Sequence, residues 1–271
     1  MNAGDRRSLE ALLAPRDEPP AGALSNVLVF GWRAILKIKR IPEQIFDVLV
    51  TPVMFTVLFT WLFGNALAGS TDAYLQYLLP GVLVQIAVFT SVYTGFTLNN
   101  DLSRGVYDRF RSMPIWKPAP LVGALLGDTF RFTAASLVGL TVGLVMGYRP
   151  PAGVLGVVAS IAILDAFALG IAWIFVTFAL VVRTPSTVLT ASWFVLFPLT
   201  FLSNVYVDPA TLPAWLQDVV AANPVTHVVA AIRRTMAGEV RAADVGLALL
   251  TPGVVAAIFA PLSVRLYGRT R

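Results

Sequence analysis

The chain has 271 residues, of which 57% are hydrophobic and only 13% are charged, and its mean hydropathy is +0.75. A soluble domain carries about twice that share of charged residues, so an ordinary soluble protein is excluded. The absence of cysteine excludes disulfides and thiolate sites, and one histidine leaves little for a transition-metal site. The net charge of +5 comes without the basic, aromatic-interleaved patch typical of nucleic-acid binding. The composition predicts an all-α polytopic membrane protein.

The first predicted elements are a polar tail and an amphipathic helix. Residues 1–22 are rich in proline and mixed in charge, which predicts a disordered cytoplasmic tail. Residues 23–41 carry basic side chains on one side of a helix and apolar side chains on the other, which is typical of a helix lying in the membrane interface. The basic residues are Arg33, Lys37 and Arg40. This helix either anchors the chain to anionic lipid or also contacts a cytoplasmic partner.

Six apolar runs follow, each near the ~20 helical residues that cross ~30 Å of hydrocarbon. The predicted spans are about 46–63, 78–98, 121–147, 153–182, 186–204 and 243–264. Fifteen of the twenty lysines and arginines fall on the side that holds both chain ends, and four fall on the other side. Because cytoplasmic loops carry the excess of Lys and Arg, both termini are predicted to be cytoplasmic. Residues 23–271 are therefore interpreted as one transmembrane domain.

A polar, arginine-rich stretch at 99–120 separates the second span from the third. Four charged residues in it are spaced at i, i+3, i+7 and i+10, which predicts one short charged helix. These residues are Asp101, Arg104, Asp108 and Arg111. Gly105 permits close approach of another backbone, and Pro114 ends the element. On physical grounds alone, the stretch is either a solvated loop that fixes topology or a contact site for a cytoplasmic protein.

The segment 205–242, between the fifth and sixth spans, is too long for a turn and too polar for another full span. Its pattern predicts two short helices dipping into the outer leaflet, the first starting at Pro213 and the second after the break at Asn223 and Pro224. Trp215 suits the headgroup level. The segment is either a helical cap on the surface or an outer gate beside an exit path.

Three ionisable residues fall within predicted spans: Asp128, Arg131 and Asp165. A charge at the bilayer centre costs at least about 2.5–3.5 kcal/mol, so such residues usually face protein or water and form pairs. Arg131 lies at a depth from which it reaches Asp165 on the next span, and Asp128 competes from the position three residues earlier. Either pairing would stabilise the bundle, and the alternative is a role in the substrate path.

Two motifs give the chain a resemblance to a known family. The first is DLSRGVYDRFRSMP at 101–114. The second is the downstream pattern of LPAWL at 212–216, NPVT at 223–226, Ala231, Arg233 and Gly238. With six spans and an amphipathic first helix, they resemble type-2 ABC exporter permeases, in particular the membrane subunits of daunorubicin/doxorubicin-resistance exporters. The family's loop commonly has more acidic residues before its Arg-Gly pair, whereas Leu102 and Ser103 stand there in this sequence.

The resemblance implies that the loop is a coupling helix, seated in a groove of a cytoplasmic ATP-binding subunit. The residues that it implicates in coupling are Asp101, Arg104, Gly105, Asp108, Arg109, Arg111, Pro114, Arg33, Lys37 and Arg40. It implies an outer gate that includes Pro213, Trp215, Asn223 and Pro224. It also implies a second copy of the permease or a homologue, because six spans are too few for a full pore.

The chain contains three lysines and none follows a glycine, so it has no Walker A phosphate-binding loop. ATP and Mg²⁺ are accordingly expected on the partner subunit, with no cofactor and no enzyme activity on this chain. The expected function is export of a hydrophobic or amphiphilic drug or lipid-like molecule across the bacterial plasma membrane. One alternative is a permease for polysaccharide or glycolipid, and a remote one is an ion-driven secondary transporter, whose inverted repeats the sequence does not show.

Overall fold

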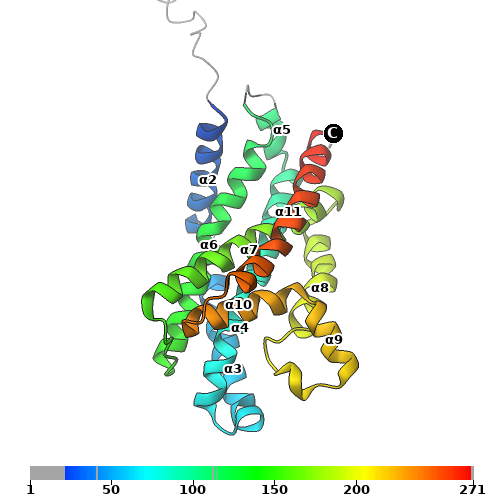
Figure 1. The fold of residues 1–271 in the computed structure, drawn as a ribbon. Coiled ribbons are helices and arrows are strands. Elements are labelled where there is room, and N and C mark those ends of the chain that lie inside the picture. Colours follow the sequence, from blue (N-terminus) through cyan, green and yellow to red (C-terminus); the bar gives the residue numbers. More distant parts are fainter. Residues whose placement is uncertain (1–21, 41, 112, 114, 270–271) are drawn as a thin grey trace, which may run out of the picture.

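The computed structural model describes residues 22–40, 42–111, 113 and 115–269, and within them it contains helices and turns but no strand (Figure 1). The long helices are α2 (Ala23–Arg40), α3 (Pro42–Ala68), α4 (Thr71–Ser103), α6 (Ala119–Val145), α7 (Gly153–Val181), α8 (Pro185–Phe201) and α11 (Ala242–Arg269). The short ones are α5 (Val106–Arg111), η1 (Pro209–Thr211), α9 (Ala214–Ala222) and α10 (Pro224–Ala237). The all-α prediction is confirmed for these residues. The predicted tail, apart from residue 22, lies outside them.

Helix α4 forms the centre of the bundle. It contacts α3, α6, α7, α8 and α10, and nearly all of its side chains from Tyr74 to Val92 are buried. Small polar residues at these contacts link the helices: Ser91 Oγ lies 2.7 Å from the carbonyl oxygen of Ala87 in α4 and 3.3 Å from that of Ala168 in α7. Helix α11 packs against α7 and α10 and leaves most of its surface exposed. Protein therefore surrounds α4, whereas lipid or a partner must cover α11.

Among the described residues, five helices are long and apolar enough to cross a bilayer: α3, α4, α6, α7 and α11. They correspond to the predicted spans at 46–63, 78–98, 121–147, 153–182 and 243–264. The first two are longer than predicted, because only residues 69–70 separate α3 from α4. The Ser70 hydroxyl accepts the N–H of Ala73 and so begins α4 at once.

The predicted fifth span, 186–204, corresponds to α8, which has 17 residues. It begins where the Thr184 hydroxyl accepts the N–H of Thr187, with Pro185 in the first turn. It ends at Phe201, earlier than predicted, and no helix covers residues 202–208. Seventeen residues rise about 26 Å, at the short end of what a crossing needs. A crossing by α8, and with it the total of six, stays a prediction.

Helix α2 packs lengthwise on the first half of α6, and the two run in the same direction. Glycines allow the close contact, because a Cβ atom at Gly123 would lie 2.4 Å from that of Phe30, and one at Gly127 would lie 2.3 Å from that of Ala34. Val27 and Gly31 are buried on this face. The apolar side chains of Leu28 and Trp32 remain exposed. That exposed stripe is consistent with a membrane-interface helix, a location that stays a prediction.

Two glycine substitutions at this crossing are expected to differ. Gly127→Ala should lower the free energy of unfolding by about 1–3 kcal/mol, because the new methyl group collides with Ala34 and α2 must shift. Gly31→Ala is the matched control, since its Cβ would meet nothing closer than 3.5 Å, the carbonyl oxygen of Gly123. Denaturant unfolding of the purified variants in detergent measures both. Equal destabilisation by the two substitutions would contradict the contact.

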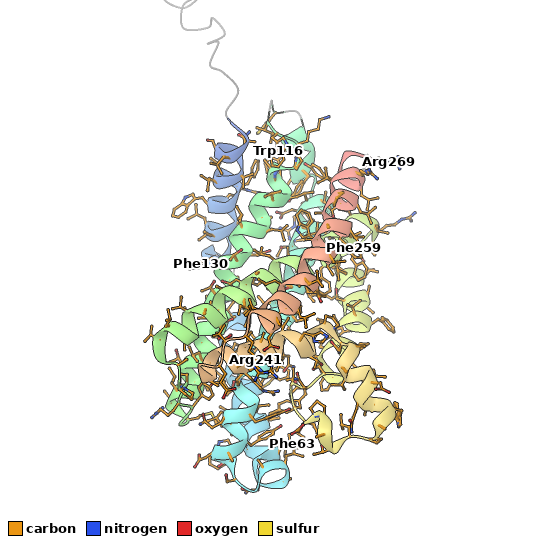
Figure 2. All side chains as sticks on the ribbon, viewed as in Figure 1. Phe63, Trp116, Phe130, Arg241, Phe259 and Arg269 are labelled. Carbon is orange, nitrogen blue, oxygen red and sulfur yellow. The ribbon has the colours of Figure 1, made fainter. Side chains whose placement is uncertain are left out.

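Different elements form the two ends of the bundle. The start of α2, α5 and the end of α11 lie together at one end, and the α3–α4 turn, α9 and α10 lie toward the other (Figure 1). Trp116 and Arg269 mark the first end and Phe63 the second (Figure 2). The two ends of the described chain therefore lie on the same side of the bundle, and their cytoplasmic location stays a prediction.

Candidate functional site

At the first end, Asp101 joins α4 to α2. Lys37 Nζ donates to Asp101 Oδ1 at 2.7 Å, and Arg33 Nη2 lies 3.9 Å from Asp101 Oδ2. The Asp101 side chain is only 14% exposed. The structure thus brings together three residues that sequence reasoning assigned to a partner contact. Asp101 is engaged within the chain, and no sequence pattern predicts this pairing of residues 64 positions apart.

The predicted continuous charged helix from Asp101 to Arg111 is wrong. Helix α4 ends at Ser103, and α5 begins at Val106. Gly105 between them has φ +68°, a left-handed conformation that glycine adopts without strain and that ends an α-helix. The spacing of the charges is therefore not that of one helical face. Gly105 forms a sharp joint between α4 and α5, and the close approach of another backbone there stays a prediction.

Aromatic residues hold α5 against its neighbours. Tyr107 is buried, and its ring lies 5.6 Å from that of Tyr267 in α11, centroid to centroid. The Phe110 ring lies 4.9 Å from that of Phe30 in α2, and the Arg33 guanidinium lies 5.0 Å from the Phe110 centroid. Burial raises the pKa of Tyr107 far above its usual value, so its phenol stays neutral. We refer to these contacts of α2, α4, α5 and α11 as the α5 cluster.

Two of the predicted coupling residues face outward from the α5 cluster. Arg104 and Arg109 are both exposed, one in the α4–α5 joint and one on α5. Pro114 lies outside the described residues. The side chains of Arg40, Asp108 and Arg111 lie outside what the structure describes, so the contacts predicted for them stay predictions. The described cations exposed on this surface therefore include Arg104 and Arg109.

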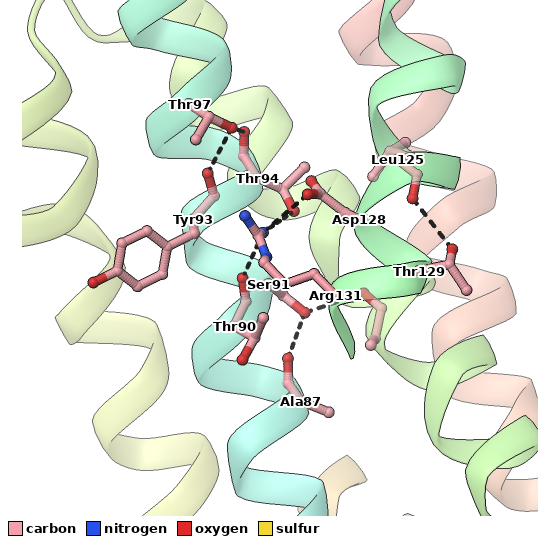
Figure 3. A network of polar contacts seen from close by, with 11 residues as sticks. Ala87, Thr90, Ser91, Tyr93, Thr94, Thr97, Leu125, Asp128, Thr129 and Arg131 are labelled. Atoms are coloured by element: carbon pink, nitrogen blue, oxygen red, sulfur yellow. Dashed lines mark hydrogen bonds and ion pairs between the residues drawn. The ribbon is translucent and has the colours of Figure 1, made fainter. Parts of the chain in front are cut away.

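Beneath the α5 cluster lies a buried ion pair. Arg131, 2% exposed, places Nη2 3.1 Å from Asp128 Oδ1 and 3.0 Å from the carbonyl oxygen of Thr90 in α4 (Figure 3). The Thr94 hydroxyl lies 3.4 Å from the same nitrogen. Asp165 instead accepts a hydrogen bond from Thr133 at 2.6 Å. The Arg131–Asp128 pairing is confirmed and the Arg131–Asp165 alternative is wrong.

A small cavity connects the Asp101 salt bridges with the Arg131–Asp128 ion pair. Its volume is about 40 Å³, room for more than one water molecule. Arg33, Lys37 and Asp101 line it on one side, and Asp128 and Arg131 line it on the other. Polar lining therefore extends from the α5 cluster into the middle of the bundle, between α4 and α6.

At the opposite end, the structure contains the two short helices predicted for the segment 205–242. Asn223 fixes their geometry: its Oδ1 accepts the N–H of Val225 at 2.9 Å to cap α10, and Pro224 occupies the first position of that helix. Its Nδ2 also donates to the Leu202 carbonyl oxygen at 2.6 Å, which holds the end of α8. Pro213 immediately precedes α9, and Trp215 is 69% exposed. Whether these helices dip into the membrane stays a prediction.

Sequence reasoning counted Arg233 among the charges outside the cytoplasm and named it in the downstream motif, but gave it no contact or role. Arg233 donates to the carbonyl oxygens of Tyr77, Asn204 and Val205 at 3.0, 2.8 and 3.3 Å. Its guanidinium lies 3.7 Å from the Tyr77 ring centroid. Burial lowers the pKa of Arg233, an effect that Tyr77 and Asp208 oppose. Arg233 thus ties α10 to α4 and to the segment that follows α8.

Comparison with known proteins decides the family. The family model described as "ABC-2 type transporter" matches residues 25–237. The chain belongs to this ABC-2 family. The match spans most of the described helices, from α2 to the end of α10.

Several known permeases are similar in sequence to this ABC-2 chain. It is 44% identical over 260 residues to the daunorubicin resistance ABC transporter permease protein DrrB1 of Streptomyces coeruleorubidus, covering 96% of this chain and 92% of the relative. It is 26% identical to the probable doxorubicin resistance ABC transporter permease protein DrrC of Mycobacterium tuberculosis, covering 95% of each. It is 24% identical to the putative transport permease ycf38 of Cyanophora paradoxa, covering 78% of this chain and 73% of the relative.

The predicted resemblance is confirmed. This ABC-2 chain is a membrane permease, a transport subunit homologous to permeases of drug-resistance exporters. The family implies that ATP is hydrolysed on a separate chain and that permeases work in pairs. The several membrane-length helices agree with a multi-pass membrane protein.

Proposed function

We propose that this permease exports a hydrophobic or amphiphilic drug or lipid-like molecule from a bacterial cell, driven by a cytoplasmic ATPase subunit that holds the ATP and Mg²⁺. The names of two relatives, which refer to daunorubicin and doxorubicin resistance, support drug-type cargo. No cofactor is proposed on this chain. One alternative, a permease for polysaccharide or glycolipid, would also work with an ATPase subunit. The other, an ion-driven secondary transporter, would need no ATPase.

The proposed topology has six crossings in the bacterial inner membrane, with α8 as the fifth. Both chain ends and the α5 cluster face the cytoplasm, which accords with the shared location of α2, α5 and the end of α11 (Figure 1). The segment with α9 and α10 lies on the outer side as re-entrant helices forming a gate. Lipid covers exposed faces such as that of α11, and a second permease copy completes the path.

The observation that carries the proposed mechanism is the arrangement of the α5 cluster. Gly105 turns α5 away from α4, exposing Arg104 and Arg109, while Tyr107 and Phe110 attach α5 to α2 and α11. A protein that pushes on α5 therefore moves three other helices with it. The ATPase subunit is the proposed source of that force, and α5 with its exposed arginines is the proposed contact.

The test is ATP-driven export with the two exposed arginines reversed in charge. In vesicles that contain the permease and its ATPase, Arg104→Glu with Arg109→Glu should lower doxorubicin accumulation at least about tenfold, a loss equivalent to about 1.4 kcal/mol at the contact. Arg241→Glu is the control and should be neutral, because Arg241 is exposed and lies well away from Trp116 and the end of the bundle that holds α5 (Figure 2). Unchanged export by the double variant would contradict the contact. Export driven by a proton or sodium gradient without nucleotide would favour the carrier.

A further inference from the structure

A cavity of about 420 Å³ lies at the end of the bundle opposite to the α5 cluster. The end of α3, the start of α4 and the chain after α8 form its walls. The lining residues are Ala66, Leu67, Ala68, Tyr74, Tyr77, Tyr206, Val207, Asp208 and Thr211. Its volume lies within the range of about 300–1,000 Å³ that is usual for small-molecule sites. All of its walls come from one copy of the chain.

Three tyrosines line this cavity, and their hydroxyl groups are engaged within the protein. Tyr74 Oη donates to the carbonyl oxygen of Tyr206, and Tyr77 Oη donates to that of Asn204, each at 3.0 Å. Tyr206 Oη donates to the side-chain oxygen of Gln85. The walls are therefore largely aromatic and aliphatic. Such surfaces favour a flat apolar ligand.

The aromatic wall continues from the cavity into the bundle. The Tyr206 ring stacks on Phe59 of α3 at 4.6 Å and lies 5.4 Å from Phe201 of α8. Phe59 is in turn 5.7 Å from Phe55, which contacts Phe89 of α4 at the same distance. A row of rings thus leads from the middle of the α3–α4 contact to the cavity.

Asp208 is the one charged residue among those that line the cavity. It is exposed, its Oδ1 accepts the N–H of Ala210, and it forms no salt bridge within the described part of the chain. Arg233 is close enough to influence it but does not line the cavity, being held by three carbonyl oxygens over the Tyr77 ring. The positive charge of Arg233 partly offsets the negative potential around Asp208, but no salt bridge joins the two side chains. The cavity therefore combines aromatic walls with one available negative charge.

We propose that this cavity binds an organic cation with a flat apolar body. The body lies against the apolar lining of the cavity, and the charged group approaches Asp208. The site is within one protomer and precedes release on the side where α9 and α10 lie. Its place as the last station on the export path rests on the proposed function, whereas ligand binding itself needs neither ATP nor the partner subunit.

Two flat dyes, one cationic and one neutral, test whether binding requires a positive charge on the ligand. The full chain in nanodiscs is titrated with rhodamine 6G, a flat cation, and with Nile red, a flat neutral dye, against empty nanodiscs, and binding is followed by fluorescence anisotropy. Asp208→Asn should weaken rhodamine 6G about fivefold, the size of a partly exposed charge contact, and leave Nile red unchanged. Asparagine keeps the side-chain oxygen that accepts the Ala210 N–H, so the local turn is preserved. Asp218→Asn, an exposed α9 substitution outside the cavity, is the matched control.

A second variant tests the location. Ala68→Trp places an indole in the cavity and should reduce binding of both dyes at least about tenfold, with its folded state checked by thermal unfolding. Equal effects of Asp208→Asn and Asp218→Asn on rhodamine 6G, or no effect of Asp208→Asn, would overturn the site. ATP-driven export by the wild type together with either of those results would reject the cavity and keep the proposed function. The expected binding differences without any ATP-driven export would reject the proposed function and keep the cavity.

Discussion

Replacing Arg131 by methionine is expected to lower the free energy of unfolding by about 3–5 kcal/mol, because it leaves a buried carboxylate without its cation. Asp128 is 6% exposed and pairs with Arg131 at 3.1 Å. The substitution also removes the donor to the Thr90 carbonyl oxygen. Methionine is close to arginine in length and flexible, so lost packing adds little. Thermal or denaturant unfolding in detergent measures the loss.

The double variant separates the unpaired charge from any other effect of the substitution. Asp128→Asn with Arg131→Met removes both charges and should recover most of the stability, because no charge remains buried. Arg149→Met is the control, since Arg149 also bonds backbone carbonyl oxygens but lies in the turn after α6. A double variant as unstable as Arg131→Met alone would show that the ion pair is not what the single substitution breaks.

The membrane-length helices could be predicted from sequence because lipid imposes one simple rule. A backbone in hydrocarbon must satisfy its own hydrogen bonds, so a long apolar run becomes a helix. The rule does not locate helix ends outside the hydrocarbon, and it therefore missed the continuation of α3 and α4 to the turn at residues 69–70. Those ends depend on local capping, as at Ser70.

The pairing of Arg131 shows a second limit. Depth along a span can be counted from the sequence, but the direction in which a helix faces its neighbours cannot. Asp128 and Asp165 were therefore equal candidates. In the structure Thr133, two residues beyond Arg131 and therefore on a different face of α6, donates a hydrogen bond to Asp165, whereas Arg131 pairs with Asp128. Only packing against α4 and α7 sets that rotation.

Sequence reasoning located the charged residues and the glycine around α5, but neither the aromatic residues of the α5 cluster nor its connections to α2 and α11. The motif located Asp101, Arg104 and Gly105, and the helical spacing of the charges suggested one outward face. A glycine at φ +68° changes that geometry, and Lys37 captures Asp101 from a distant part of the chain. The contacts of Arg233 were missed for a related reason, because its partners are backbone carbonyl oxygens, which no sequence pattern identifies.

Reversing the charge of Asp101 is expected to reduce ATP-driven export at least about tenfold. In Asp101→Lys, three cations would meet where Arg33 and Lys37 now bracket a carboxylate, and juxtaposed like charges cost several kcal/mol. The end of α4 would then separate from α2, and movement of α5 would no longer reach α2 through the α4 contact. Doxorubicin accumulation and ATP hydrolysis, measured in the same vesicles, should show hydrolysis retained and export lost.

The swapped pair decides whether Asp101 acts inside the permease or on the ATPase. Lys37→Asp with Asp101→Lys restores an opposite-charge pair at the 2.7 Å contact and should recover much of the export that Asp101→Lys loses. Asp218→Lys, an exposed reversal on α9, is the control for added positive charge. If Asp101 instead contacted the ATPase directly, a lysine there would stay harmful whatever stood at position 37. Recovery would mean that the force entering at α5 reaches the bundle partly through a tie between two segments of this same chain.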